Sequence, residues 1–330
     1  SWPETIIQSP ARTTGVYGPI GAAMRTRLDE GANHYPCRVE VVTRREFLRV
    51  SGRTVAAGSA SLMIASFAAA CGGSDASGAL PGDAQLVQRF PQNLVVGDIR
   101  MPLSVASAGQ LLTAESSTPD ELVSSIVRID GGRDELVLEN LRAPRHDANL
   151  AVPYWPFRAT ITEPGFYRLV VEGGPSDGAA FQVVGRGEVK VPGVGDALTA
   201  FDTPTFADAR GVDPICTRLP EPCPLHEVSL RDALARGVPV VLLVGTPAHC
   251  STGTCAPALE ALVSVAASGS DAVFIHAEVY ADPDATQVAP IVEALAMNYE
   301  PALFVTDSSG IVVARLDAVF DEVELASVVG

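Results

Sequence analysis

Basic residues are scarce in this sequence. Lysine and arginine together number 23 against 39 aspartates and glutamates, which gives the 330-residue chain a formal charge of −16. A nucleic-acid-binding surface needs a basic stripe or patch. The charge balance therefore argues against a nucleic-acid partner and favours an acidic, soluble surface. The length is sufficient for two ordinary domains, each with its own core.

A long apolar run is also missing near the N-terminus. The weakly apolar stretch Thr54–Ala70 has 17 residues rich in Ala, Ser and Gly, too short and too mild for a membrane span. It follows Arg44 and Arg45 and ends in small residues. Residues 42–71 therefore resemble a twin-arginine export signal, and a buried Ala-rich helix is the alternative.

The segment AAAC at the end of this stretch resembles a lipobox, with Ala68 at the position where leucine is usual. The resemblance implies that Cys71 becomes the lipidated first residue of a bacterial lipoprotein, anchored on the extracytoplasmic side of the cell membrane. Otherwise Cys71 is a lone thiol in a flexible tail. Residues 72–85 are rich in Gly and Ser and predict a flexible tether. We expect residues 1–41 not to belong to the mature protein.

Four of the six cysteines form two close pairs, a usage that suits an oxidising compartment. Cys216 and Cys223 lie in the Pro-rich segment CTRLPEPC, which has no strand or helix to position a nucleophile. This pair predicts a structural disulfide. His226 would complete a trio of metal ligands with it, but the sequence indicates no fourth ligand. We therefore predict neither a metal nor a cofactor.

Residues 86–187 contain short β-rich runs separated by turn residues, without helical periodicity. SSIVRIDGGRDELVLENL predicts two strands around a Gly-Gly turn, and YWPFRATITEPGFYRLVVEGG predicts a strand on each side of an EPG turn. The pattern favours an antiparallel β-sandwich. Its segment PGFYRLVVE resembles the closing strands of immunoglobulin-like modules. We expect Tyr154 and Trp155 to pack within this module, and residues 188–225 to form a linker that carries the disulfide.

From His226 onward, helical segments alternate with apolar strands. VPVVLLVG is uniformly apolar, as central parallel strands are, and PALFVTDSSGIVVARLD predicts a hairpin. The expected order is β-α-β-α-β-β-α, with Cys250 and Cys255 at the start of the first long helix and Pro301 directly before ALFVTD. These features resemble a thioredoxin-like domain over residues 226–330. The resemblance implies a cis-proline at Pro301 that faces reactive cysteines.

The spacing of Cys250 and Cys255 departs from that family, because four residues separate them instead of two. A helix N-terminus favours thiolate over thiol, and a second thiol can resolve a mixed disulfide. If CAPA matches the family motif, Cys255 attacks and Cys250 resolves; in the other alignment the roles are reversed. We favour the first. His249 adds positive charge if it folds against the thiols, and no acidic residue interrupts VPVVLLVG to carry a proton.

Three functions fit these features. The first is an exported, lipid-anchored thiol–disulfide oxidoreductase that acts on protein thiols and disulfides outside the cytoplasmic membrane. The second is a copper-handling protein resembling the Sco type, in which soft thiolates would bind Cu(I) with His276, a residue in the middle of a predicted strand. The third is a non-enzymatic cell-surface binding protein with a disulfide-stapled scaffold. We favour the first.

Overall fold

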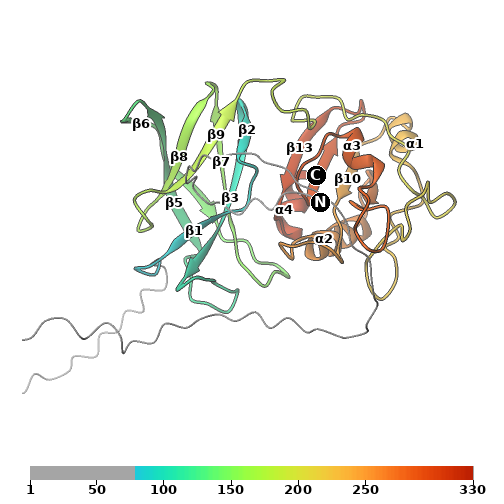
Figure 1. The fold of residues 1–330 in the computed structure, drawn as a ribbon, viewed down its shortest axis with the longest axis horizontal. Coiled ribbons are helices and arrows are strands. Elements are labelled where there is room, and N and C mark those ends of the chain that lie inside the picture. Colours follow the sequence, from blue (N-terminus) through green and yellow to red (C-terminus); the bar gives the residue numbers. More distant parts are fainter. Residues whose placement is uncertain (1–78, 330) are drawn as a thin grey trace, which may run out of the picture. The chain divides into compact units, whose positions relative to one another are not determined.

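The computed structural model describes residues 79–329 (Figure 1). The predicted export signal, with Arg44, Arg45 and Cys71, lies outside these residues, as do residues 1–41 and residues 72–78 of the tether. The described chain is mostly β-sheet with few helices, so the β-rich prediction is confirmed. Within residues 79–329, no helix is both long and apolar enough to cross a membrane.

Residues 79–184, the N-terminal region, form two sheets (cyan to green in Figure 1). The strands are β1 (Gln85–Gln88), β2 (Asn93–Val95), β3 (Gly97–Ser107), β4 (Gln110–Leu111), β5 (Glu121–Asp130), β6 (Arg133–Pro144), β7 (Trp155–Ile161), β8 (Gly165–Val171) and β9 (Ala179–Val184). One sheet has the order β1-β3-β4, with β7 also paired to β3, and the other has the order β2-β9-β8-β5-β6. All pairings are antiparallel except that of β2 with β9.

Alternating side chains from both sheets share one core in this region. Trp155 and Phe157 on β7 are buried together with Leu169 on β8 and Phe181 on β9. The predicted Gly-Gly turn joins β5 to β6, where both glycines have positive φ values. The predicted EPG turn joins strands of different sheets, because β7 pairs with β3 whereas β8 pairs with β5 and β9. Trp155 is buried in this core, as expected, whereas Tyr154 is buried in a separate cluster with Leu150 and Val319.

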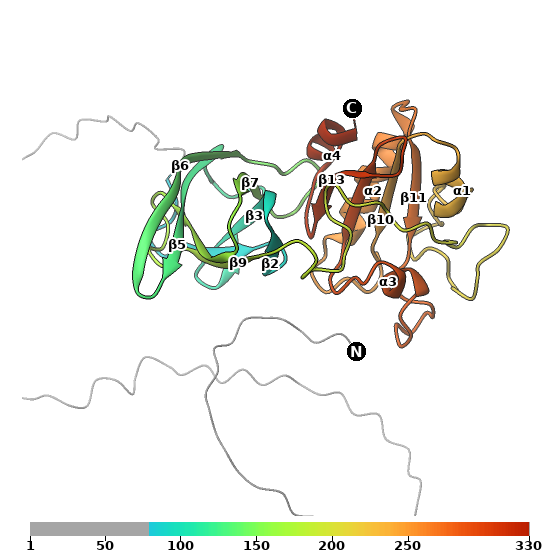
Figure 2. The same cartoon turned by 90° about the horizontal axis from the view of Figure 1, so that it is seen from above.

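Residues 188–329, the C-terminal region, contain one four-stranded sheet and four helices (Figures 1 and 2). The elements are α1 (Leu230–Ala235), β10 (Val240–Val244), α2 (Cys255–Ala267), β11 (Val273–Ala277), α3 (Pro290–Ala294), β12 (Ala302–Thr306), β13 (Val312–Asp317) and α4 (Glu322–Val329). The sheet order is β11-β10-β12-β13, in which β10 runs parallel to β11 and antiparallel to β12.

Both faces of this sheet are covered, which is why β10 is uniformly apolar. Leu242 of β10 packs in a core with residues of α1 and α3. Leu243, its neighbour, packs in a second core with residues of α2 and α4. Because successive side chains of a strand point to opposite faces, one pair of helices covers each face. Helix α1 starts at a cap in which the Ser229 side chain accepts from the Asp232 N–H at 3.2 Å, and Gly237, at φ +67°, follows its end.

The segment predicted as a linker, residues 188–225, has no regular helix or strand but packs on the C-terminal region. Val191, Leu198 and Val212 are buried in the same core as α1 and α3. The backbone N–H of Leu198 donates to the Gly310 carbonyl at 2.9 Å, beside the β12–β13 hairpin. Most of the expected linker is therefore part of the folded C-terminal region.

A buried ion pair connects the two regions. Arg100 on β3 donates to both carboxylate oxygens of Glu324 on α4, at 2.7 and 2.6 Å. The Tyr154 hydroxyl donates to the same carboxylate at 2.6 Å, and Arg158 donates to it at 2.6 Å. Since Glu324 is buried, its charge depends on these donors.

Candidate functional site

The thiols of Cys250 and Cys255 meet at the N-terminus of α2. Cys250 lies in the loop after β10, and Cys255 is the first residue of the helix. The Cys255 thiol donates to Cys250 Sγ at a sulfur–sulfur distance of 2.6 Å. The loop turns back at Gly253, whose φ of +68° is readily adopted by glycine. The structure therefore brings together the two cysteines that sequence analysis named.

Cys250 Sγ occupies the position of a helix cap. It accepts from the backbone N–H of Cys255 at 3.3 Å, one of the donors that a helix N-terminus leaves unpaired. Thr252 Oγ1 lies 3.2 Å from the same sulfur. The hydrogen bond from the Cys255 thiol, followed by those of Thr252 and the backbone, lowers the pKa of Cys250 to about 5 despite its partial burial. Cys250 is thus held as a thiolate near neutral pH.

Cys255 has the opposite character. Its side chain is buried, with 1% of its surface exposed, whereas Cys250 is half-buried. Burial raises the pKa of Cys255 well above the usual thiol range, and the hydrogen bond to Cys250 and the charge of Glu300 raise it further. A buried, protonated thiol is a poor first nucleophile. These features point away from the alignment that we favoured and toward Cys250 as the attacking thiol.

Glu300 is a site residue that sequence analysis missed. Its Oε2 lies 3.5 Å from Cys255 Sγ and accepts from the Thr246 N–H at 2.9 Å. Burial raises the pKa of Glu300 to about 7. The strand β10 contains no acidic residue, and the acidic residue beside the thiols instead directly precedes Pro301. Glu300 could have been identified from the sequence, because it is an acidic residue next to Pro301, the proline expected to face the thiols.

Pro301 lies against the same part of the site. The Glu300–Pro301 peptide bond is cis, as expected. A Cβ atom added at Gly245 would lie 3.2 Å from Pro301 Cβ and 3.6 Å from Cys255 Sγ, so both side chains pack against the Gly245 backbone.

His249 is the predicted supporting residue that the structure places elsewhere. It is exposed, and its ring lies edge-on to Tyr280 with centroids 5.9 Å apart. Over residues 79–329, its ring makes no hydrogen bond to either thiol. The hydrogen bonds of Thr252 and the helix N-terminus supply the stabilisation that we expected from His249.

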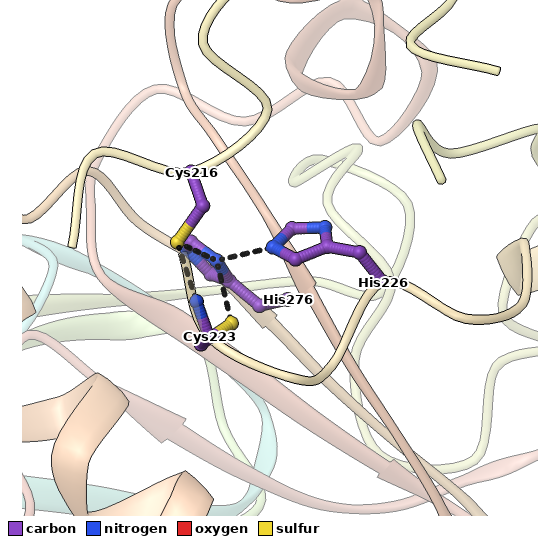
Figure 3. A group of neighbouring side chains, drawn as sticks. All are labelled: Cys216, Cys223, His226 and His276. Carbon is purple, nitrogen blue, oxygen red and sulfur yellow. Dashed lines mark hydrogen bonds between the residues drawn. The ribbon is translucent and has the colours of Figure 1, made fainter. Parts of the chain in front are cut away.

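The second cysteine pair does not form the predicted disulfide. Cys216 and Cys223 are free thiols in the structure, and both lie 3.6 Å from Nδ1 of His276. His226 Nε2 lies 3.3 Å from the same nitrogen, so four side chains converge (Figure 3). The ligand atoms of all four lie within 4.8 Å of one another, and all four residues are buried. Both sulfurs face Nδ1 of the His276 imidazole in place of the expected sulfur–sulfur bond.

The copper hypothesis combined His276 with Cys250 and Cys255. In the structure, His276 instead contacts Cys216 and Cys223. The residue lies on β11, and its Nε2–H donates to the Gly245 carbonyl at 2.9 Å, since a carbonyl can only accept. Its Nδ1 faces Cys216 and Cys223. Sequence analysis named all the members of this cluster but did not bring them together, because His276 is 60 residues from Cys216 in the chain.

A scan of the sequence against protein-family models gave no match, and a search of curated proteins gave no significant match either. We therefore infer the function from the residues and geometry of the chain itself.

Proposed function

We propose that the protein is a thiol–disulfide oxidoreductase in which Cys250 attacks and Cys255 resolves. The observation that carries this proposal is the hydrogen bond from the buried Cys255 thiol to the partly exposed Cys250 sulfur at the start of α2. A low-pKa sulfur that a substrate can reach, backed by a second thiol, is the arrangement that two-electron exchange requires.

We further propose that residues 226–330 form a thioredoxin-like domain and residues 86–187 an immunoglobulin-like sandwich. The β11-β10-β12-β13 order, the helix that starts at Cys255 and the position of Pro301 beside Cys255 support the first assignment. The two antiparallel-rich sheets with a shared core support the second. A fold likeness alone does not define an activity, so the function is argued from the thiols.

In the first chemical step, the Cys250 thiolate attacks one sulfur of a substrate disulfide. A bond forms between Cys250 and that sulfur, the substrate S–S bond breaks, and the other substrate sulfur leaves as a thiolate that takes a proton from water. The hydrogen bonds that hold the Cys250 thiolate also lower its nucleophilicity, but at neutral pH almost all of it is ionised.

In the second step, Glu300 accepts the proton of Cys255. The Cys255 thiolate then attacks Cys250 Sγ and forms the Cys250–Cys255 disulfide. The bond between Cys250 and the substrate sulfur breaks, and that sulfur leaves as a thiolate that takes the proton held by Glu300. The protein loses two electrons, and the substrate gains them. With a pKa of about 7, Glu300 is partly ionised at neutral pH and can take up and release this proton. The reverse sequence oxidises a substrate dithiol.

We also propose an extracytoplasmic location, with residues 42–71 as a twin-arginine signal and a lipid on Cys71. The pattern of the arginines, the apolar stretch and AAAC supports it. Changing both Arg44 and Arg45 to Lys should keep the chain in the cytoplasm, as followed by fractionation. Undiminished export of the doubly substituted chain would contradict the twin-arginine assignment.

The test of the exchange reaction is to measure the reduction potential of the Cys250–Cys255 pair and to trap the intermediate. The full chain is equilibrated in graded redox buffers, free thiols are alkylated, and the labelled residues are located by mass spectrometry. A potential between about −270 and −120 mV is typical of exchange proteins, whereas one below about −300 mV is typical of structural disulfides and would contradict the proposal.

Trapping assigns the order of the thiols. After reaction with a glutathionylated peptide, Cys255→Ser should retain a mixed disulfide on Cys250, because no thiol remains to resolve it. Cys250→Ser is the matched control and should retain none. A stable adduct on Cys255 in Cys250→Ser, with none on Cys250 in Cys255→Ser, would reverse the assignment.

A further inference from the structure

The ligand atoms of Cys216, Cys223, His226 and His276 have the spacing of a tetrahedral metal site. His276 Nδ1 lies 3.6 Å from each sulfur and 3.3 Å from His226 Nε2. A tetrahedral zinc ion, with Zn–S near 2.3 Å and Zn–N near 2.05 Å, separates sulfur from nitrogen by about 3.6 Å and nitrogen from nitrogen by about 3.3 Å. We propose that these four residues bind one Zn²⁺ ion.

The donor set favours zinc over copper. Two thiolates and two imidazoles in a tetrahedral array are characteristic ligands of Zn²⁺. Two thiolates carry two negative charges, so Zn²⁺ with neutral imidazoles gives a neutral centre, whereas Cu(I) would leave one uncompensated charge. All four residues are buried, with between 0% and 4% of their surface exposed. An uncompensated charge in such surroundings is strongly unfavourable.

The Nδ1 atom of His276 is already oriented for metal binding, because the other ring nitrogen has a partner. Its Nε2–H donates to the Gly245 carbonyl at 2.9 Å, which leaves Nδ1 without a proton in the neutral ring and directed at Cys216 and Cys223. Backbone carbonyls commonly hold the free N–H of a metal-bound histidine in this way and fix its tautomer. The ring therefore needs no rearrangement to become a ligand.

The site is closed, which indicates a structural role. Four protein ligands fill a tetrahedral coordination sphere, and catalytic zinc sites instead keep a position for water or substrate. Cys216, Cys223 and His226 lie in an irregular segment, whereas His276 is on β11. The ion would fasten this segment to the sheet, the role that we expected of a disulfide.

This site shares no residue with the thiol pair, so the two proposals can fail independently. The experiment uses the full chain, purified under reducing conditions without added metal, and metal content is measured by elemental mass spectrometry. We expect one zinc per chain in the native protein and in the control Cys250→Ser. In the double variant Cys216→Ser, Cys223→Ser the zinc content should fall about tenfold or more, because two ligands are lost.

A measurement on the native sequence keeps the test independent of variants that fold poorly. Zinc is replaced by Co²⁺, whose visible spectrum reports geometry and sulfur ligation. We expect the intense d–d bands of tetrahedral cobalt with sulfur-to-metal charge transfer, and loss of both bands when zinc is returned. A native protein without stoichiometric metal, an octahedral cobalt spectrum, copper in place of zinc, or a Cys216–Cys223 disulfide in the reduced preparation would overturn the proposal.

Discussion

The two cysteine pairs lie in the same region of the chain but in different surroundings. Cys250 is partly exposed at a helix N-terminus, and its partner Cys255 faces a carboxylate. Cys216 and Cys223 are both buried and face an imidazole. The side chain that faces each pair of thiols decides the chemistry. The Glu300 carboxylate, with a pKa near 7, can exchange a proton with a thiol, whereas the imidazole nitrogens beside Cys216 and Cys223 add donors to a metal site.

Removing the attacking thiol from the Cys250–Cys255 pair should give the largest effect. Cys250→Ser should lower the rate of disulfide exchange by about a thousandfold or more, because the attacking group is lost. The rate is followed by reduction of a peptide disulfide, and the zinc content of the same preparation should stay at one per chain. A variant that lost zinc as well would break the distinction between the two pairs.

Global stability can be changed without touching either pair. Glu324→Gln should lower the free energy of unfolding by about 3 kcal/mol, because it leaves the buried Arg100 without its carboxylate. Unfolding in urea measures the difference. The matched control is Glu163→Gln, which removes an ion pair with Arg128 on a side chain that is 68% exposed and should change stability by less than about 1 kcal/mol.

In the absence of urea, where both are folded, Glu324→Gln and Glu163→Gln should retain the exchange rate and zinc content of the native protein. If Glu324→Gln shifted the potential of the Cys250–Cys255 pair, the thiol site would depend on the contact between the two regions, and the comparison would have to include the N-terminal region.

Glu300, the carboxylate beside the Cys250–Cys255 pair, should affect how the free energy of unfolding depends on pH. Glu300 has a pKa of about 7 in the folded chain against 4.5 unfolded, so the folded state binds the proton more tightly. The contribution of Glu300 to stability should therefore fall as the pH rises from 4.5 to 7 and then level off. The Cys250 thiolate, with a pKa of about 5 in the folded chain, contributes stability that rises with pH over an overlapping range, so the difference between the native protein and Glu300→Gln isolates the contribution of Glu300. Glu300→Gln removes this fall and should be more stable than the native protein above pH 7, by about 2 kcal/mol after allowance for partial exposure.

Urea unfolding at several pH values, with the thiols reduced, measures this difference. Equal slopes in the native protein and Glu300→Gln between pH 4.5 and 7 would remove Glu300 as a proton carrier. The exchange rate of Glu300→Gln should also fall, and its dependence on pH above 6 should weaken.

The smallest effect is expected at the backbone that both pairs share. In Gly245→Ala the new Cβ would crowd Pro301 Cβ at 3.2 Å and touch Cys255 at an ordinary contact distance of 3.6 Å. We expect a loss of about 1 kcal/mol in the free energy of unfolding and a measurable shift in the potential of the Cys250–Cys255 pair. Gly82→Ala is the control, because no atom lies within 4 Å of a Cβ built there. An unchanged potential in Gly245→Ala would show that the thiol site tolerates displacement of Pro301.

The regular elements could be predicted from sequence because their signals are local. The Gly-Gly turn between β5 and β6, the Ser229 cap and the uniformly apolar β10 each depend on neighbouring residues. The start of α2 at Cys255 followed from the same local pattern.

Glu300 and His276, which face the two pairs of thiols, could not be assigned to their sites from local signals. Glu300 is 45 residues from Cys255, and His276 is 60 residues from Cys216. The register of β11 sets His276 opposite Leu243, whose face of the sheet also holds Cys216. A shift by one residue would direct the imidazole to the other face, and periodicity in a short apolar run does not specify that register.

The burial of the cluster formed by Cys216, Cys223, His226 and His276 limits when a metal ion can enter the molecule. Three of its ligands, Cys216, Cys223 and His226, come from one short segment and the fourth, His276, from β11, and all four are closed off from solvent once the sheet has formed. Ions would enter while the chain is still open, and later exchange would be slow. If folding precedes export, the ion that each molecule carries would preserve a record of the metal pool in the compartment where it folded.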